Sequence, residues 1–177
     1  MPVLLSVSIE RWPIAGAFTI ARGARTEAVV VVAELRDGPH WGRGECTPYA
    51  RYGETVEGVA AAIAGLREAV ANGLDREALQ RVMPAGAARN ALDCAFWDLE
   101  AKRSGRPVHA LAKLPPPRPC VTAYTISLGS PEAMAEAAAK AAGRPLLKVK
   151  LGGEGDPARI RAVRAAAPEA ELIVDAN

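Results

Sequence analysis

The chain has 177 residues, 50% of them hydrophobic, and its formal net charge is +2 at pH 7; this length suits one ordinary domain or two small ones. The basic residues are dispersed among acidic ones and form no run with interleaved aromatic residues, so we expect no nucleic-acid partner. No apolar stretch approaches the ~20 residues that cross a bilayer, and the first residues lack the basic segment and cleavage site of a signal peptide, so we expect no membrane partner.

The first part of the chain is patterned as three strands. Residues 3–10 alternate between apolar and polar side chains, which is the period of a strand, and residues 28–36 form a continuous β-branched run. Asp37-Gly38 is a turn signal, after which residues 40–47 return as a third strand. We predict a three-stranded antiparallel meander.

Three helices are predicted after the meander. Apolar residues recur at helical spacing over 56–70, and Asn72-Gly73 would end that helix. Asp75 can cap a short second helix, and residues 84–105 form a third that ends at Gly105. Strands followed by helices indicate an α+β unit.

The proline-rich segment 113–119 reads as a linker, and the pattern changes after it. Strands are predicted at 120–128, 146–151 and 171–177, separated by two helices that Ser130-Pro131 and Asp156-Pro157 would begin. This alternation is typical of parallel βαβ units.

The predicted fold class is therefore an α+β domain over residues 1–115, followed over residues 116–177 by the first βα units of a (β/α) barrel. Three strands cannot close such a barrel, which takes roughly 250 residues. We expect the chain to be the front part of a longer protein, truncated after the third barrel strand.

Lys148 and Lys150 are unusual in an apolar strand, because Lys is rarely buried without a partner. Side chains two apart on a strand share a face, so both amines should point into the barrel near its carboxyl end, where barrel active sites lie. Extension of both amines to solvent from an edge strand is the alternative.

Asp175 ends the next predicted strand, where a carboxylate can bind a hard cation such as Mg²⁺; a helix cap or turn is the alternative role. Repulsion from Lys148 and from a nearby cation would make Lys150 easier to deprotonate, so that it could act as a general base. Lys148 would stay protonated and stabilise developing negative charge. The chemistry that needs this set is abstraction of a proton alpha to a carboxylate.

Five stretches spread over nearly the whole chain are "FTIARGARTEAVVVVAEL", "GRGECTPYARYGET", "PAGAARNALDCAFWDLEAK", "LLKVKLGG" and "LIVDAN". Together they resemble the enolase superfamily in its muconate-lactonizing branch, and more closely its dipeptide epimerases. The resemblance implies Mg²⁺-dependent epimerization of a dipeptide of the L-Ala-D/L-Glu type through an enolate, in turnover of cell-wall peptides, by an enzyme that is usually a homo-oligomer.

The resemblance also implies roles for individual residues. Lys150 matches the acid/base lysine, Lys148 the lysine that contacts the substrate carboxylate, and Asp175 the first Mg²⁺ ligand. Three further positions match residues that contact the substrate. They are Thr125, Tyr52 and Arg25, with Arg22 as the alternative to Arg25. The family also needs two more acidic ligands and a second catalytic lysine on later strands, so we expect this chain to be inactive alone.

Other readings remain open at this stage. A muconate cycloisomerase or an o-succinylbenzoate synthase of the same branch would share the two lysines and the aspartate. A Schiff-base lysine in an aldolase-type barrel would need neither the lysine pair nor a cation. A truncated protein without catalytic function is the non-enzyme alternative.

The remaining reactive side chains are interpreted as structural. The three cysteines are scattered without the spacing of a metal site, which indicates a reduced, cytoplasmic protein with incidental thiols. The isolated histidines and the acidic residues of the third helix receive no catalytic role. These residues are Cys46, Cys94, Cys120, His40, His109, Asp93 and Asp98.

Overall fold

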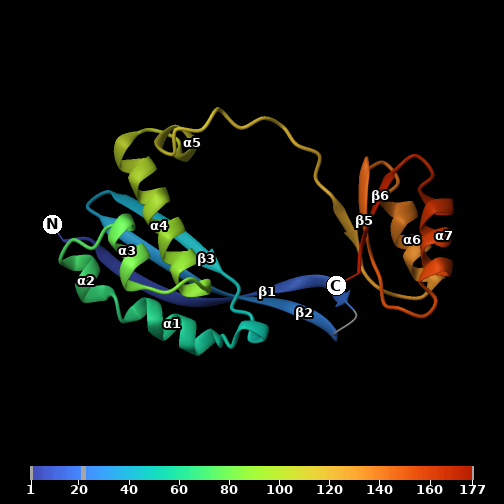
Figure 1. Ribbon diagram of the computed structural model, residues 1–177, viewed down its shortest axis with the longest axis horizontal. Helices are drawn as coiled ribbons and strands as arrows, with labels where there is room; N and C mark the ends of the chain where they lie inside the picture. The colour runs from blue at the N-terminus through green and yellow to red at the C-terminus, as the bar shows by residue number, and fades with distance from the viewer. Residues whose placement is uncertain (1, 21–22, 177) are drawn as a thin grey trace. The chain divides into compact units, whose positions relative to one another are not determined.

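The computed structural model describes residues 2–20 and 23–176, and they form two compact units (Figure 1). The first unit contains the residues up to Trp12 together with Glu27–Pro117, and the second contains Pro13–Thr26 together with the residues from Arg118 onward. Within the described ranges, every helix is too short or too polar to cross a membrane.

The first unit is built on a sheet in the order β1-β2-β3. These strands are β1 (Leu4–Ile20), β2 (Gly23–Asp37) and β3 (His40–Cys46). β2 pairs antiparallel with β3, from Val31 opposite Cys46 to Asp37 opposite His40. The predicted meander is confirmed, but β1 and β2 extend well beyond 3–10 and 28–36, because their exposed parts have no apolar alternation that a sequence pattern could reveal.

Helices follow in the first unit as predicted, with two differences. They are α1 (Val56–Ala64), α2 (Arg67–Ala71), α3 (Arg76–Val82), α4 (Ala87–Ser104) and the short α5 (Val108–Leu111), preceded by a 3₁₀ turn, η1 (Ala50–Tyr52). The single helix expected over 56–70 is broken at Gly65 and Leu66, since glycine weakens a helix interior. α5 lies in a segment for which no helix was predicted.

The ends of these helices are formed as the sequence indicated. The Asp75 carboxylate accepts a hydrogen bond of 2.7 Å from the Ala78 N–H, which caps α3. Gly105 adopts the left-handed conformation, with φ of 64°, that ends α4.

The core of the first unit lies between the sheet and these helices. Its fully buried members include Val31, Ala33 and Leu35 from β2, and Leu92 and Ala95 from α4. Burial also raises the pKa of the Cys46 thiol to about 11, so this cysteine behaves as a core hydrophobe rather than a nucleophile.

Two glycines allow α4 to approach β3 very closely. A Cβ atom on Gly42 or Gly44 would collide with the α4 backbone at Ala95 and Ala91, and one on Gly44 would also lie 2.8 Å from Cys94 Cβ. Asp98 of α4 then accepts a 2.8 Å hydrogen bond from the Arg43 N–H. Asp98 therefore has a structural role, since it occupies a backbone donor of β3 at the edge of the sheet.

The second unit contains a parallel sheet in the order β4-β5-β6. Its strands are β4 (Tyr124–Ile126), β5 (Leu146–Lys150) and β6 (Glu171–Asp175), and its helices are α6 (Pro131–Lys140) and α7 (Asp156–Ala166). Ile126, Leu147, Val149, Met134 and Val163 form the centre of its core. The predicted strand–helix–strand–helix–strand order is confirmed.

The beginnings of α6 and α7 differ in how they are capped. Ser130 caps α6 as predicted, because its side chain accepts a 3.2 Å hydrogen bond from the Ala133 N–H. The prediction that Asp156 caps α7 was wrong. The carboxylate of Asp156 instead turns back and accepts hydrogen bonds from the Gly152 and Gly153 N–H groups of the preceding loop, where exposed glycine donors compete with the first turn of the helix.

The close approach of α4 to β3 gives a stability prediction. Gly44→Ala should destabilise the protein by about 1–3 kcal/mol, because the added methyl group overpacks the interface with α4. Denaturation by urea measures the loss. Gly143→Ala is the control, since nothing lies within 4 Å of a Cβ there, and it should change stability by less than about 0.5 kcal/mol. Equal effects of the two substitutions would contradict the packing argument.

Candidate active site

The register of the parallel sheet brings four predicted site residues to one face. Thr125 of β4 lies opposite Lys148 of β5, and Lys150 lies opposite Asp175 of β6. Partners in a parallel sheet share a face, and residues two apart on a strand do as well. The other face of β5 carries Leu147 and Val149, which are fully buried against the helices.

The two lysines meet at a single carboxylate oxygen. Lys148 Nζ lies 2.7 Å and Lys150 Nζ 2.8 Å from Oδ2 of Asp175. The side chain of Lys150 is only 10% exposed and that of Lys148 is 36% exposed. The amines thus do not extend to bulk solvent as the alternative required; they form a compact cluster in which one negative charge offsets the repulsion between two positive ones.

The last residues of β1, from Pro13 to Ile20, belong to the same unit as this cluster. The Phe18 ring centroid lies 5.9 Å from Lys150 Nζ, within the range of a cation–π interaction. The Thr19 carbonyl accepts a 3.1 Å hydrogen bond from the Leu128 N–H, just after β4. Sequence reasoning missed Phe18, and the only available signal was an aromatic residue near the arginines of the same segment.

The loop after β5 is held by Asp156 and Arg159. Besides the hydrogen bonds from Gly152 and Gly153, Asp156 accepts a hydrogen bond of 3.0 Å from the Arg159 guanidinium. The Arg159 Nε–H donates to the Gly129 carbonyl at 2.9 Å. These contacts join the loop after β5 to the loop after β4. The Gly152 N–H above all, with the Gly153 N–H and Arg159, holds the pKa of the Asp156 carboxyl below its ordinary value.

The remaining predicted site residues occupy other places. Arg25 lies in the part of β2 that groups with the second unit and is exposed. Arg22 lies outside the described residues. Tyr52 belongs to the first unit, where its side chain is 76% exposed and its ring centroid lies 5.6 Å from that of Tyr49. Thr125 is half-buried in β4.

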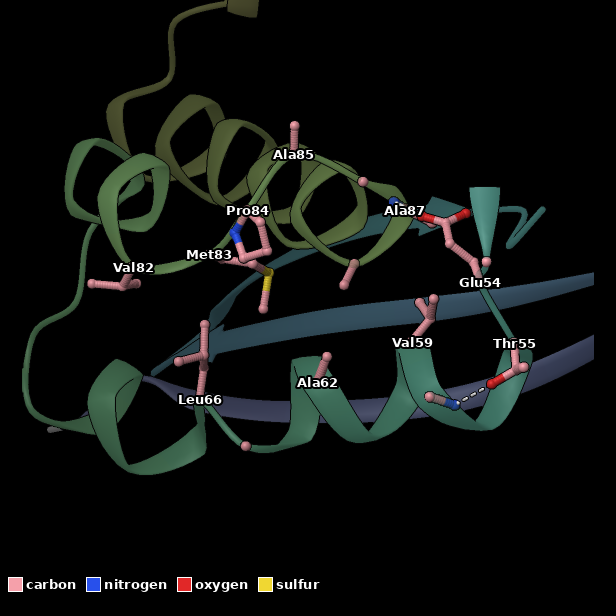
Figure 2. A pocket seen from close by; sticks show the side chains of 15 residues that line it. Glu54, Thr55, Val59, Ala62, Leu66, Val82, Met83, Pro84, Ala85 and Ala87 are labelled. Atoms are coloured by element: carbon pink, nitrogen blue, oxygen red, sulfur yellow. Dashed lines mark hydrogen bonds between the residues drawn. The ribbon is translucent and has the colours of Figure 1, made fainter. Parts of the chain in front are cut away.

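A cavity of about 560 Å³ lies in the first unit between α1 and the segment that leads into α4 (Figure 2). Its lining is mostly apolar and small, with Val59, Ala62 and Leu66 on one side and Met83 and Pro84 on the other (Figure 2). Glu54 is the sole ionisable group among the described residues that line it. One carboxylate without a second acid, base or nucleophile does not make this cavity a second catalytic centre.

The described residues offer one metal ligand rather than a metal centre. Asp175 is a carboxylate at the carboxyl end of a parallel strand, which suits one ligand of a hard cation. Within residues 2–20 and 23–176, no group of three or more His, Cys, Asp and Glu side chains could hold a metal ion. The set fits Mg²⁺ only as a partial site that needs further oxygen ligands.

An α+β unit followed by parallel βα units, with charged groups gathered at the ends of the parallel strands, is the arrangement found at the start of (β/α)-barrel proteins that carry a capping domain. The chain belongs to the mandelate racemase / muconate lactonizing enzyme family, whose N-terminal domain model matches residues 4–112. The expected fold and family are thereby confirmed, and the named relatives of the chain are epimerases and racemases.

The chain is 49% identical over 170 residues to the L-Ala-D/L-Glu epimerase of Escherichia coli, a match that covers 95% of this chain and 53% of that protein. It is 41% identical to an N-acetyl-D-glutamate racemase of a Pseudoalteromonas species, over 84% of this chain and 47% of the relative. The chain thus spans about half the length of the curated relatives it matches.

Solved structures support the assignment of the chain to this family. An enolase family member from Agrobacterium tumefaciens, with homology to dipeptide epimerases and with bound sodium and L-Ala-L-Glu, is 57% identical with a TM-score of 0.95, covering 99% of this chain and 54% of that one. A dipeptide epimerase from Enterococcus faecalis complexed with Mg and L-Leu-L-Tyr is 27% identical with a TM-score of 0.88, over 100% of this chain and 54% of that one.

The shared carboxylate predicts a loss of stability in Asp175→Asn. This substitution removes the charge that both ammonium groups contact, and because Lys150 is largely buried we expect a loss of about 1–3 kcal/mol in urea denaturation without added metal. Glu136→Gln is the matched control, since it removes the partner of the exposed Lys140 at 2.7 Å, and should have a negligible effect. An unchanged stability in Asp175→Asn would mean that the ion pairs are not formed in solution.

The Asp156 contacts predict a pH dependence. The folded pKa of Asp156 lies below its ordinary value of 3.8, so its stabilising contribution is present above that value and is lost as the pH falls through the folded pKa. The urea midpoint of the parent should exceed that of Asp156→Asn at neutral pH, and the two should converge on acidification. A difference that persisted unchanged in acid would contradict this assignment.

Proposed function

We propose that the protein to which this chain belongs is an epimerase of a dipeptide of the L-Ala-D/L-Glu type, acting at the carbon next to the terminal carboxylate. The observation that carries the proposal is the lysine pair at Asp175, on the sheet face opposite the helices. The 49% identity to an L-Ala-D/L-Glu epimerase and the 57% identity to a structure with bound L-Ala-L-Glu support the choice of substrate.

Lys150 is proposed as the base on one face of the substrate. Once the Lys150 ammonium has given up a proton, its amine takes the alpha proton, the C–H electron pair passes into the substrate carboxylate as an enolate, and the new N–H bond holds the proton. Return of a proton to the opposite face gives the epimer, with no net oxidation or reduction. This chain matches only about half the length of its relatives. The group that returns the proton on the opposite face would lie in the part of the complete protein that corresponds to their unmatched half.

Lys148 and Asp175 are proposed to stabilise charge in this reaction. The Lys148 ammonium contacts the substrate carboxylate, on which negative charge accumulates. Mg²⁺, with Asp175 as one of its ligands, would supply further electrostatic stabilisation of that charge. Phe18 lies beside Lys150, and the Asp156–Arg159 contacts hold the loop that follows β5.

Arg25, Arg22, Thr125 and Tyr52 are proposed to contact the dipeptide. We further propose a cytoplasmic, homo-oligomeric enzyme in turnover of cell-wall peptides, without nucleic-acid or membrane partners. A racemase of N-acylated glutamate is the second candidate, favoured by the 41% identity to an N-acetyl-D-glutamate racemase. The two substrates differ in the group on the amino nitrogen, so a panel of both kinds separates them.

Loss of the proposed base should abolish proton exchange on one face. In the complete protein, Lys150→Ala should slow deuterium uptake at the alpha carbon of one epimer by at least about 10²-fold, followed by NMR in deuterated buffer. Lys140→Ala is the control, since it removes an exposed lysine of α6, and should exchange both epimers normally. The 177-residue chain alone should give no exchange above buffer.

Uptake at the parental rate in Lys150→Ala would remove this lysine from its role. Trapping of the substrate by borohydride would favour Schiff-base chemistry instead. Absence of exchange from every member of the panel by the complete protein would overturn the proposed function itself.

A further inference from the structure

Glu54 links two segments of the first unit through hydrogen bonds that take no part in the proposed proton transfer. We call this link the Glu54 tether. The Glu54 carboxylate accepts a 2.7 Å hydrogen bond from the Ala87 N–H at the start of α4 through Oε1, and a 3.0 Å hydrogen bond from the Tyr49 N–H through Oε2. Figure 2 shows this side chain extending from the segment before α1 toward Ala87. One carboxylate thus joins two segments that are far apart in the sequence.

The tether replaces a missing helix cap. α4 is 18 residues long, and the residue at its N-cap is Gly86, which has φ of 157° and no side chain to accept from the first turn. A Cβ at Gly86 would lie 3.0 Å from Glu54 Oε1, so glycine gives the carboxylate room. An anion at a helix N-terminus is stabilised by the helix dipole, and the Ala87 and Tyr49 N–H groups lower the pKa of Glu54.

The other end of the tether is the base of a short loop that carries Tyr52. The Tyr52 N–H donates to the Tyr49 carbonyl at 2.9 Å, and the Gly53 N–H donates to the Ala50 carbonyl at 3.0 Å. Gly53 is in the left-handed conformation, with φ of 74°. The loop is therefore closed upon itself, and its base is fixed to α4 through the Tyr49 N–H.

Packing contributes little to holding this loop. The cavity of Figure 2 and a second cavity of about 520 Å³, which Tyr49 and Tyr52 line, share Glu54, Gly86 and Ala87 in their walls. A segment bordered by open volume has few dispersion contacts, and no residue of η1 is buried. The hydrogen bonds of Glu54 are therefore a direct link between the base of the loop and the start of α4.

We propose that Glu54 is a positioning residue that sets substrate affinity by fixing the loop of Tyr49–Gly53, and with it Tyr52, to the first turn of α4. The inference rests on the proposed function, in which Tyr52 contacts the dipeptide. In this proposal Glu54 acts through Tyr52 and takes no part in the proton transfer. Its loss should therefore change KM rather than kcat.

The substitution that tests this is Glu54→Gln in the complete protein. The amide keeps one acceptor oxygen and presents an NH₂ group to the second backbone donor, so one end of the tether is lost. We expect KM for the dipeptide to rise about tenfold with kcat nearly unchanged. Glu57→Gln, in the exposed first turn of α1, is the matched control and should leave both constants unchanged.

A double-mutant cycle distinguishes positioning from general weakening of the fold. If Glu54 acts through Tyr52, the KM of Glu54→Gln/Tyr52→Ala should equal that of Tyr52→Ala alone. Fully additive effects on KM, or a fall in kcat without a change in KM, would overturn the proposal. Should Glu54→Gln fold poorly, Glu54→Asp, which keeps the charge but shortens the reach, takes its place in the cycle.

Amide hydrogen exchange provides a readout that does not need activity. Exchange in Tyr49–Gly53 should accelerate in Glu54→Gln but not in Glu57→Gln, while the middle of α4 keeps its protection. Unchanged protection of the loop would overturn the tether. If the complete parental protein catalyses no alpha-proton exchange in any dipeptide, the proposed function and the substrate part of this inference both fail. Amide hydrogen exchange would still show whether Glu54 holds the loop.

Discussion

Two ammonium groups on one side of β5 share a single carboxylate oxygen on β6, and the interpretation of the second unit depends on this contact. The period of a strand places Lys148 and Lys150 on the same face, and the parallel register places Asp175 opposite Lys150. Without the carboxylate, two positive charges would lie close together, and one of them belongs to the largely buried Lys150. Such an arrangement is unfavourable in a protein interior. The cluster is therefore a preorganised group of charges rather than two independent surface lysines.

The same unit shows how the surroundings of that cluster are fixed. The end of β1 contributes Phe18 near Lys150 and a backbone contact from Thr19 to Leu128. Asp156 and Arg159 connect the loops that follow β4 and β5. Groups held by several independent contacts have little freedom to reorganise, which favours electrostatic stabilisation of developing charge. In the first unit, close glycine contacts fix α4 against β3, and Glu54 fixes the loop of Tyr52 against α4.

Much of this architecture could be predicted from local patterns. The turn at Asp37-Gly38, the caps at Asp75 and Ser130 and the end of α4 at Gly105 rest on interactions between residues close in sequence, and all were predicted. Asp156 failed as a cap because its carboxylate had two sets of backbone donors within reach, and sequence alone did not rank them. The break at Gly65 was missed because the apolar spacing continues through it over residues 56–70. The long extensions of β1 and β2 were missed because exposed segments carry no apolar period.

The sequence by itself determined the order of the elements, the family and the alternation that puts the two lysines on one face, since these depend on residue type and short-range spacing. Only the tertiary structure decided that both amines meet Asp175, that Phe18 approaches Lys150 and that Glu54 joins Tyr49 to Ala87. The physical reason is that each of these contacts joins segments separated along the chain. Their distance depends on strand register and on the packing of helices and loops, which no local pattern encodes.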